Sequence, residues 1–136
     1  TTLAAGVEQQ PNGIVVSPDQ SWVYVARSGA RDIWRFRRLP GGRLVDGEKW
    51  TDVEAEPDGM TMDRAGNLYV ALAGNGNLCV LSPEKEVLHM IPIVDRMATN
   101  CEFRGDDESV IFVTGGGKGD ARQGKVWKVT LPKSGD

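Results

Sequence analysis

Three polar side chains, Asn12, Asp58 and Asn100, stand directly before strand-like runs, and successive members are 46 and 42 residues apart. Carboxylate and amide oxygens are the ligands that Ca²⁺ and Mg²⁺ prefer in proteins, so such residues could hold a divalent cation. Asn12 and Asp58 also precede glycine, and Asn or Asp before Gly is a common turn former where a strand begins. These residues alone leave both interpretations open.

The spacing of these residues follows an internal repeat. In each repeat a small polar residue is followed by an apolar run, a turn, a second apolar run and then a third. The three copies of the first part are "PNGIVVSPDQSWVYVAR" from residue 11, "PDGMTMDRAGNLYVALA" from residue 57 and "TNCEFRGDDESVIFVTG" from residue 99. The third runs are "DIWRF" at 32–36, "NLCVL" at 77–81 and "KVWKV" at 125–129. Two of these runs, at 32–36 and 125–129, alternate apolar and charged residues with a period of two, which predicts half-exposed strands.

A weaker run ends each of the first two repeats, "GRLVDGEKW" at 42–50 and "EVLHMI" at 86–91. Four short strands in about 45 residues, repeated along the chain, are typical of a β-propeller blade. We therefore predict an all-β protein with three blades of a six-bladed β-propeller in a single half-propeller domain. The predicted repeats cover about 7–50, 51–92 and 93–136.

Three blades cannot close a ring, because propellers have four to eight, and the end blades would expose apolar faces and strand edges. The third repeat lacks a fourth run, whereas residues 1–6 resemble an outer strand placed before the first repeat. We favour a homodimer in which residues 1–6 of each chain complete the last blade of the other. The alternative is that the chain is part of a longer six-bladed protein.

Charge, the length of apolar runs and cysteine spacing indicate which partners and which compartment to expect. Sixteen basic and 19 acidic residues give a net charge of −3 without a long run of one sign, so we expect no nucleic-acid partner. The longest apolar runs have about five residues, against the roughly 20 that a membrane span needs, so we expect no membrane partner. The two cysteines, Cys79 and Cys101, fit neither a CxxC pair nor a disulfide framework, which favours buried thiols in a reducing, cytoplasmic compartment.

The stretches "GVEQQPNGIVVSPDQSWVYVARSGARDIWRF", "EPDGMTMDRAGNLYVAL" and "ATNCEFRGDDESVIFVTGG" together resemble the regucalcin (senescence marker protein) and gluconolactonase family. The resemblance covers nearly all of the chain but only the carboxy-terminal half of that family's six-bladed propeller. It implies a metal-dependent lactone hydrolase. Asn12 and Asp58 match positions where the family binds its divalent cation, and Asp58 also matches its general base. Thr99 and Asn100 match the start of the next innermost strand, which suggests a substrate-binding or supporting role.

The same resemblance implies a divalent metal cofactor, with Ca²⁺ favoured and Zn²⁺ or Mg²⁺ as alternatives, and a small sugar lactone as substrate. The family's remaining metal ligand, a Glu, and its substrate-binding Arg and Asn belong to the half that this chain does not match. Two function classes therefore remain. One is a gluconolactonase-like enzyme that acts in the central channel, and the other is a non-catalytic binding or assembly module derived from a propeller.

Other charged residues near these segments predict ordinary surface roles. We expect Glu54 and Glu56 to be solvated, and the basic group of Arg35, Arg37 and Arg38 to form a solvated strand face. The segment "GDARQGKV" at 119–126 contains the G-x-x-x-x-G-K spacing of a phosphate-binding loop, but Val126 replaces the Ser or Thr and a strand-like run follows. We expect an enlarged hairpin loop there.

Overall fold

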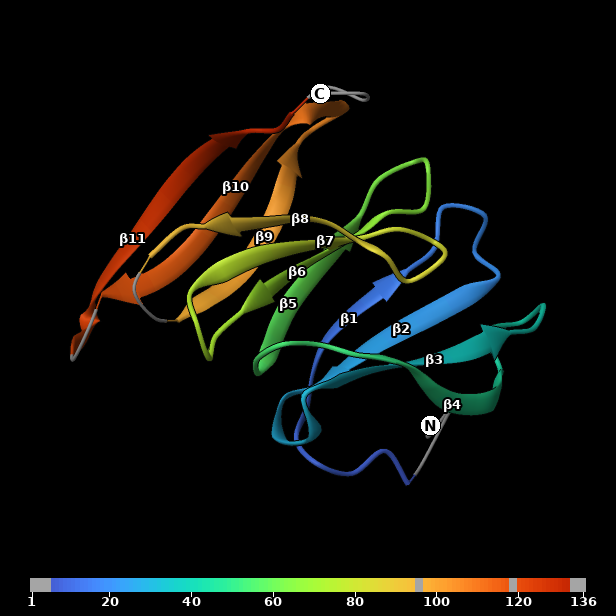
Figure 1. The fold of residues 1–136 in the computed structure, drawn as a ribbon. Coiled ribbons are helices and arrows are strands. Elements are labelled where there is room, and N and C mark those ends of the chain that lie inside the picture. Colours follow the sequence, from blue (N-terminus) through green and yellow to red (C-terminus); the bar gives the residue numbers. More distant parts are fainter. Residues whose placement is uncertain (1–5, 95–96, 118–119, 133–136) are drawn as a thin grey trace.

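The computed structural model describes residues 6–94, 97–117 and 120–132, which form three antiparallel sheets of consecutive strands (Figure 1). The first sheet has the order β1-β2-β3-β4 and the second β5-β6-β7-β8, whereas the third has β11-β10-β9. One turn of 3-10 helix, Ser28–Ala30, joins β2 to β3. No helix in the described ranges is long and apolar enough to cross a membrane. The predicted all-β fold of three blades is confirmed.

The strands follow the runs expected from the repeat. The first sheet contains β1 (Pro11–Val16), β2 (Trp22–Arg27), β3 (Asp32–Arg38) and β4 (Leu44–Asp52). The second contains β5 (Pro57–Met62), β6 (Leu68–Leu72), β7 (Asn77–Leu81) and β8 (Val87–Pro92). The third contains β9 (Ala98–Arg104), β10 (Asp107–Gly117) and β11 (Asp120–Thr130).

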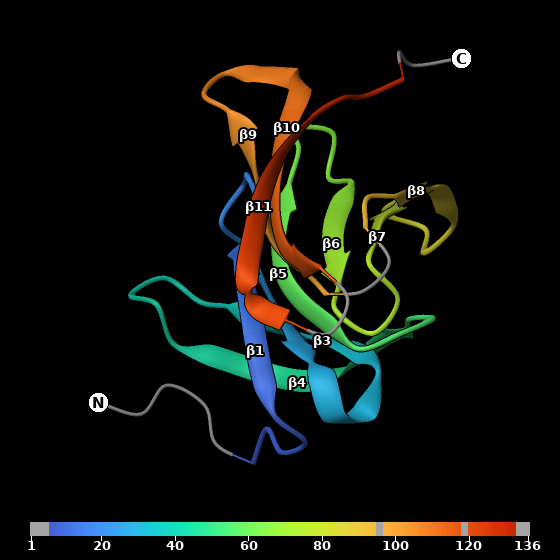
Figure 2. The same ribbon diagram turned by 90° about the vertical axis from the view of Figure 1, so that its left-hand side faces the viewer.

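The three first strands lie next to one another, since β1 contacts β5 and β5 contacts β9. β4 and β8 form the far edges of their sheets, and Figures 1 and 2 show the sheets fanned out from the first strands. This is the arrangement of neighbouring propeller blades. It brings the starts of β1, β5 and β9 to one place.

The second sheet is covered on both faces, which explains why β6 is buried along its whole length. Alternate residues of a strand point to opposite faces. Leu68 and Val70 therefore pack toward the first sheet, in a cluster with Tyr24 and Trp50, while Tyr69 packs toward the third sheet and makes an edge-to-face contact with Phe103. Two apolar interfaces between sheets make up the core.

The outer faces of the first and third sheets remain open among the described residues. Ile14 and Val16, 63% and 46% exposed, belong to the first sheet, and Phe112 and Val126, 37% and 68% exposed, belong to the third. The proposed exchange of residues 1–6 falls mostly on residues 1–5, which lie outside the described part.

The hairpin between β10 and β11 differs from the prediction. The ladder continues through Gly115 paired with Lys125 and Gly116 paired with Gly124, and it ends with Gly117 paired with Asp120. The extra residues of the third repeat therefore lengthen two strands instead of enlarging a loop. The register shifts between Gly116 and Gly117, because these neighbours pair with Gly124 and Asp120, which are four positions apart on β11.

Candidate functional site

A hollow of about 280 Å³, here called the hub pocket, lies where β1, β5 and β9 begin. All four residues predicted for the site, Asn12, Asp58, Thr99 and Asn100, line it together. The remaining lining residues are Gly13, Ile14, Gly59 and Met60. The structure therefore brings together side chains that are far apart in the sequence.

Two glycines allow the three strands to approach this closely. A Cβ atom on Gly13 would lie 2.0 Å from the backbone oxygen of Asp58, and one on Gly59 would lie 2.0 Å from Oδ1 of Asn100. Real Cβ atoms do not approach other atoms to this distance. The glycines that follow Asn12 and Asp58 are thus needed for packing between strands.

Asn12 is oriented by a short chain of hydrogen bonds. Its Nδ2 donates to Oγ of Ser28 at 3.3 Å, and the Ser28 hydroxyl donates to the backbone oxygen of Pro57 at 2.5 Å. With Nδ2 engaged, Oδ1 of Asn12 is left as the oxygen available to a ligand. Sequence reasoning missed Ser28, because no motif connects it with Asn12 or with the next repeat.

Asp58 is half-buried and carries no ion pair or hydrogen bond to another described side chain. Burial raises the pKa of its carboxyl above the ordinary value, because desolvation disfavours the charged form. A carboxylate without a counter-charge in a hollow is suited to bind a cation or to accept a proton.

Thr99, not Asn100, takes the position in β9 that Asp58 has in β5. Pro57 and Ala98 are the first residues of their strands and both pair with the next strand, so Asp58 and Thr99 are the residues that follow. The repeat alignment from the sequence was therefore one residue out of register here. The equivalent pairs show why, since Pro57 and Leu72 are 15 positions apart and Ala98 and Gly115 are 17 apart, so the third repeat is two residues longer between them.

Thr99 and Asn100 nevertheless both reach the hub pocket. The hydroxyls of Thr99 and Thr114 lie 3.0 Å apart and share a hydrogen bond. The backbone N–H of Cys101 donates to Oδ1 of Asn100 at 2.9 Å, so this oxygen is already engaged. Their geometry is compatible with contacts to a substrate or with support of the neighbouring strands.

Glu56 is not simply solvated, contrary to expectation. It pairs with Arg31 at 2.7 Å, and a Cβ on Gly74 would meet its Oε2 at 1.7 Å, so its carboxylate lies against the backbone of the β6–β7 turn. Its own backbone N–H and Arg31 lower the pKa of this carboxyl. Glu54 is exposed, as predicted. Neither residue lines the hub pocket.

The donor set of the hub pocket suits a hard cation but is incomplete. Asp58 supplies a carboxylate and Asn12 an amide oxygen, both of which fit Ca²⁺ or Mg²⁺. Ca²⁺ takes six to eight oxygen ligands. Within the described residues, no group of three or more His, Cys, Asp or Glu side chains could hold a metal ion. Further ligands would have to come from water, substrate or another polypeptide segment.

The profile of a family described as "SMP-30/Gluconolactonase/LRE-like region" matches residues 2–117. The chain belongs to this family. Among curated relatives, the 6-deoxy-6-sulfogluconolactonase of Pseudomonas putida is 30% identical over 116 residues, which are 82% of this chain and 40% of that protein. The regucalcin of Gallus gallus is 36% identical over 84 residues, 60% of this chain and 27% of that protein.

Solved structures of family members agree with the fold. The gluconolactonase XC5397 from Xanthomonas campestris superposes with a TM-score of 0.77 at 29% identity, over 97% of this chain and 40% of its own length. A luciferin-regenerating enzyme gives a TM-score of 0.76 at 25% identity, over 89% of this chain and 45% of that one. The chain thus spans less than half the length of these family members.

Proposed function

We propose that the hub pocket hydrolyses a small sugar lactone with the help of a divalent cation, Ca²⁺ in preference to Zn²⁺ or Mg²⁺, held by Asn12 and Asp58. The observation that carries this proposal is the convergence of these two oxygen donors with Thr99 and Asn100 in one hollow. Membership of the family and the relatives named gluconolactonase and sulfogluconolactonase support the substrate class.

In the proposed reaction, water adds to the lactone carbonyl carbon while the Asp58 carboxylate accepts its proton. The ring C–O bond then breaks, and the departing ring oxygen takes up the proton held by Asp58, which gives an open hydroxy acid and restores the carboxylate. A bound cation would polarise the lactone carbonyl. Thr99 and Asn100 lie where they can donate hydrogen bonds to substrate hydroxyls. Ser28 keeps the Asn12 amide in one orientation through its two hydrogen bonds.

The incomplete donor set leads to a proposal about assembly. In a homodimer that closes a six-bladed ring, the second copy would supply a second Asn12 and a second Asp58 to the same channel. The exposed apolar residues on the outer sheets, such as Ile14 and Phe112, would be covered in that ring. A longer chain that contains the other half of the propeller would meet the same need with different residues.

A second candidate is a non-catalytic binding or assembly module. The observation that favours it is the absence, in the described ranges, of a group of three strong metal-ligating side chains. Such a module would retain the Asp58 carboxylate and the neighbouring amide without turnover of lactones.

Calorimetric titration with calcium, together with hydrolysis of a panel of aldonolactones in added divalent metal, tests both candidates. We expect calcium binding and lactone turnover by the wild type, and loss of both in Asp58→Ala. Glu54→Ala is the matched control, because it removes an exposed carboxylate outside the pocket. Binding without turnover would favour the module, and identical isotherms for wild type and Asp58→Ala would exclude the metal site. The mass in solution reports separately on the dimer.

A further inference from the structure

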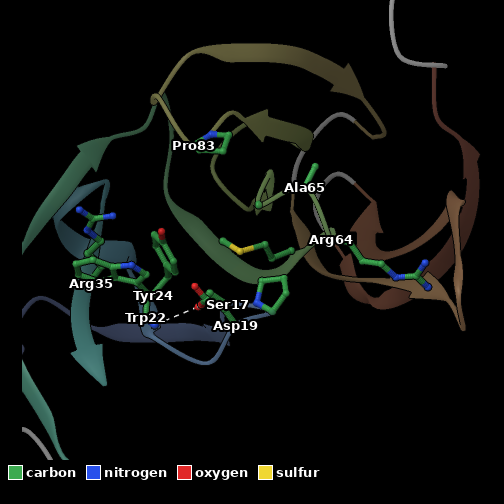
Figure 3. A pocket seen from close by; sticks show the side chains of 11 residues that line it. Ser17, Asp19, Trp22, Tyr24, Arg35, Arg64, Ala65 and Pro83 are labelled. Atoms are coloured by element: carbon green, nitrogen blue, oxygen red, sulfur yellow. Dashed lines mark hydrogen bonds between the residues drawn. The ribbon is translucent and has the colours of Figure 1, made fainter. Parts of the chain in front are cut away.

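A second hollow, of about 350 Å³, lies between the first and second sheets at the opposite ends of β1 and β5 from the hub pocket (Figure 3). We call it the turn-side pocket, because the β1–β2 and β5–β6 turns contribute to it, together with side chains of β2, β3 and β5. The residues that line it include Asp19, Trp22, Tyr24, Arg35, Met62 and Arg64. Its volume lies within the usual range for small-molecule sites, about 300–1,000 Å³.

Arg35 is held in this pocket in an unusual state. Its guanidinium carbon lies 3.8 Å from the centre of the Trp22 ring, so the cation stacks on the indole. Its Nε is buried and has no acceptor among the described residues, and no described carboxylate lies within ion-pair distance. The sequence predicted that Arg35 would belong to a solvated strand face, and for this residue the prediction is wrong.

The second sheet provides an internal comparison. Arg35 pairs with Tyr24, and the residue that pairs with the equivalent Tyr69 is Val80. Val80 is 1% exposed and packs in the apolar interface with the third sheet. A valine thus satisfies the packing of a blade at this position. An arginine there loses solvation without gaining a counter-charge, so packing does not explain it.

The other charged groups of the pocket are already engaged. Asp19 Oδ1 accepts hydrogen bonds from the hydroxyls of Ser17 and Ser21, which hold the pKa of this carboxyl at about 2. Arg64 donates to the backbone oxygen of Asp106 at 3.2 Å and points toward the third sheet, away from Arg35 (Figure 3). Arg35 is therefore the cation of this pocket whose N–H groups remain available.

We infer that the turn-side pocket binds a small organic carboxylate with an apolar body. The carboxylate would accept hydrogen bonds from the edge of the Arg35 guanidinium, whose face is occupied by Trp22. Arginine commonly combines stacking on an aromatic ring with in-plane recognition of a carboxylate. The apolar body would lie against Met62 and the ring of Tyr24, both of which line the hollow. This inference is independent of the chemistry proposed for the hub pocket.

Benzoate is a suitable probe, since it joins one carboxylate to one apolar ring, and benzamide is its uncharged analogue. Two-dimensional NMR of the indole N–H signals follows binding next to Trp22. We expect benzoate to shift the Trp22 signal with saturation, and benzamide to bind at least about tenfold more weakly, because charge-assisted hydrogen bonds are the stronger ones.

Arg35→Val introduces the residue type that the second sheet has at the equivalent position, Val80. It should weaken benzoate binding about tenfold or more while the fold is retained. Arg37→Val is the matched control, since it removes an exposed arginine of the same strand, and it should bind benzoate as the wild type does. The inference is wrong if benzoate fails to shift Trp22 at concentrations on the order of 10 mM, if benzamide binds equally well, or if Arg35→Val binds like the wild type. The comparison of benzoate with benzamide needs no variant, so it decides even if Arg35→Val is unstable.

Discussion

Replacement of Gly13 by alanine should destabilise the fold, because the added Cβ would lie 2.0 Å from the backbone oxygen of Asp58 and 3.0 Å from its carbonyl carbon. The obstacle is backbone of the neighbouring strand, so no side-chain rotation can relieve it. β1 must move away from β5. Overpacking of this kind costs about 1–3 kcal/mol, and in a domain of this size each kcal/mol lowers the melting temperature by about 3–5 °C.

Urea unfolding followed by tryptophan fluorescence and circular dichroism measures this loss. Gly124→Ala is the matched control, because its Cβ would meet its nearest neighbour, the backbone oxygen of Gly115, at 3.5 Å, an ordinary contact. The control should change the free energy of unfolding by less than about 0.5 kcal/mol. If Gly13→Ala unfolds at the same urea concentration as the wild type, the close approach of β1 and β5 is not as described. In the proposed enzyme, Gly13→Ala should also weaken calcium binding, since it separates Asn12 from Asp58.

Three further outcomes follow from buried or hydrogen-bonded groups. Asp32→Ala should cost about 3 kcal/mol or more in urea unfolding, because it leaves Arg27, whose side chain is only 14% exposed, without its partner. Burial raises the pKa of Cys79 to about 11 and that of Cys101 to about 12, so a thiol reagent at pH 8 should modify neither until the protein unfolds. Asp19 has a pKa lowered from 3.8 to about 2, so its ionised form stabilises the fold above pH 4. The difference in unfolding free energy between wild type and Asp19→Asn should therefore disappear as the pH falls from about 4 to about 2.

Much of the architecture was readable from local patterns. Alternation with a period of two, and the run-and-turn pattern of each repeat, predicted the strands, and the repeat predicted three blades. The family resemblance predicted that Asn12 and Asp58 would share one site, and both line the hub pocket. The buried free thiols of Cys79 and Cys101 were predicted correctly as well.

Contacts between repeats could not be read in the same way. The bridge from Ser28 to Pro57, the ion pair of Glu56 with Arg31 and the position of Thr99 depend on strand register and on turn geometry. A shift of one residue leaves the composition of a strand unchanged but alters which side chain faces the hub pocket.

The sequence by itself determined the all-β class, the three sheets and the set of polar residues at the strand starts, because these follow from periodicity and repetition along the chain. Only the tertiary structure decided which charges are paired and which are left alone. Arg35 and Arg37 look alike in the sequence, yet Arg37 forms an exposed ion pair with Asp46 while Arg35 stacks on Trp22 in a hollow. Both arginines lie on the same face of β3, because alternate residues of a strand share a face. Arg35 pairs with Tyr24 and lines the turn-side pocket, whereas Arg37 pairs with Trp22 and is exposed. Residue order alone does not specify that difference.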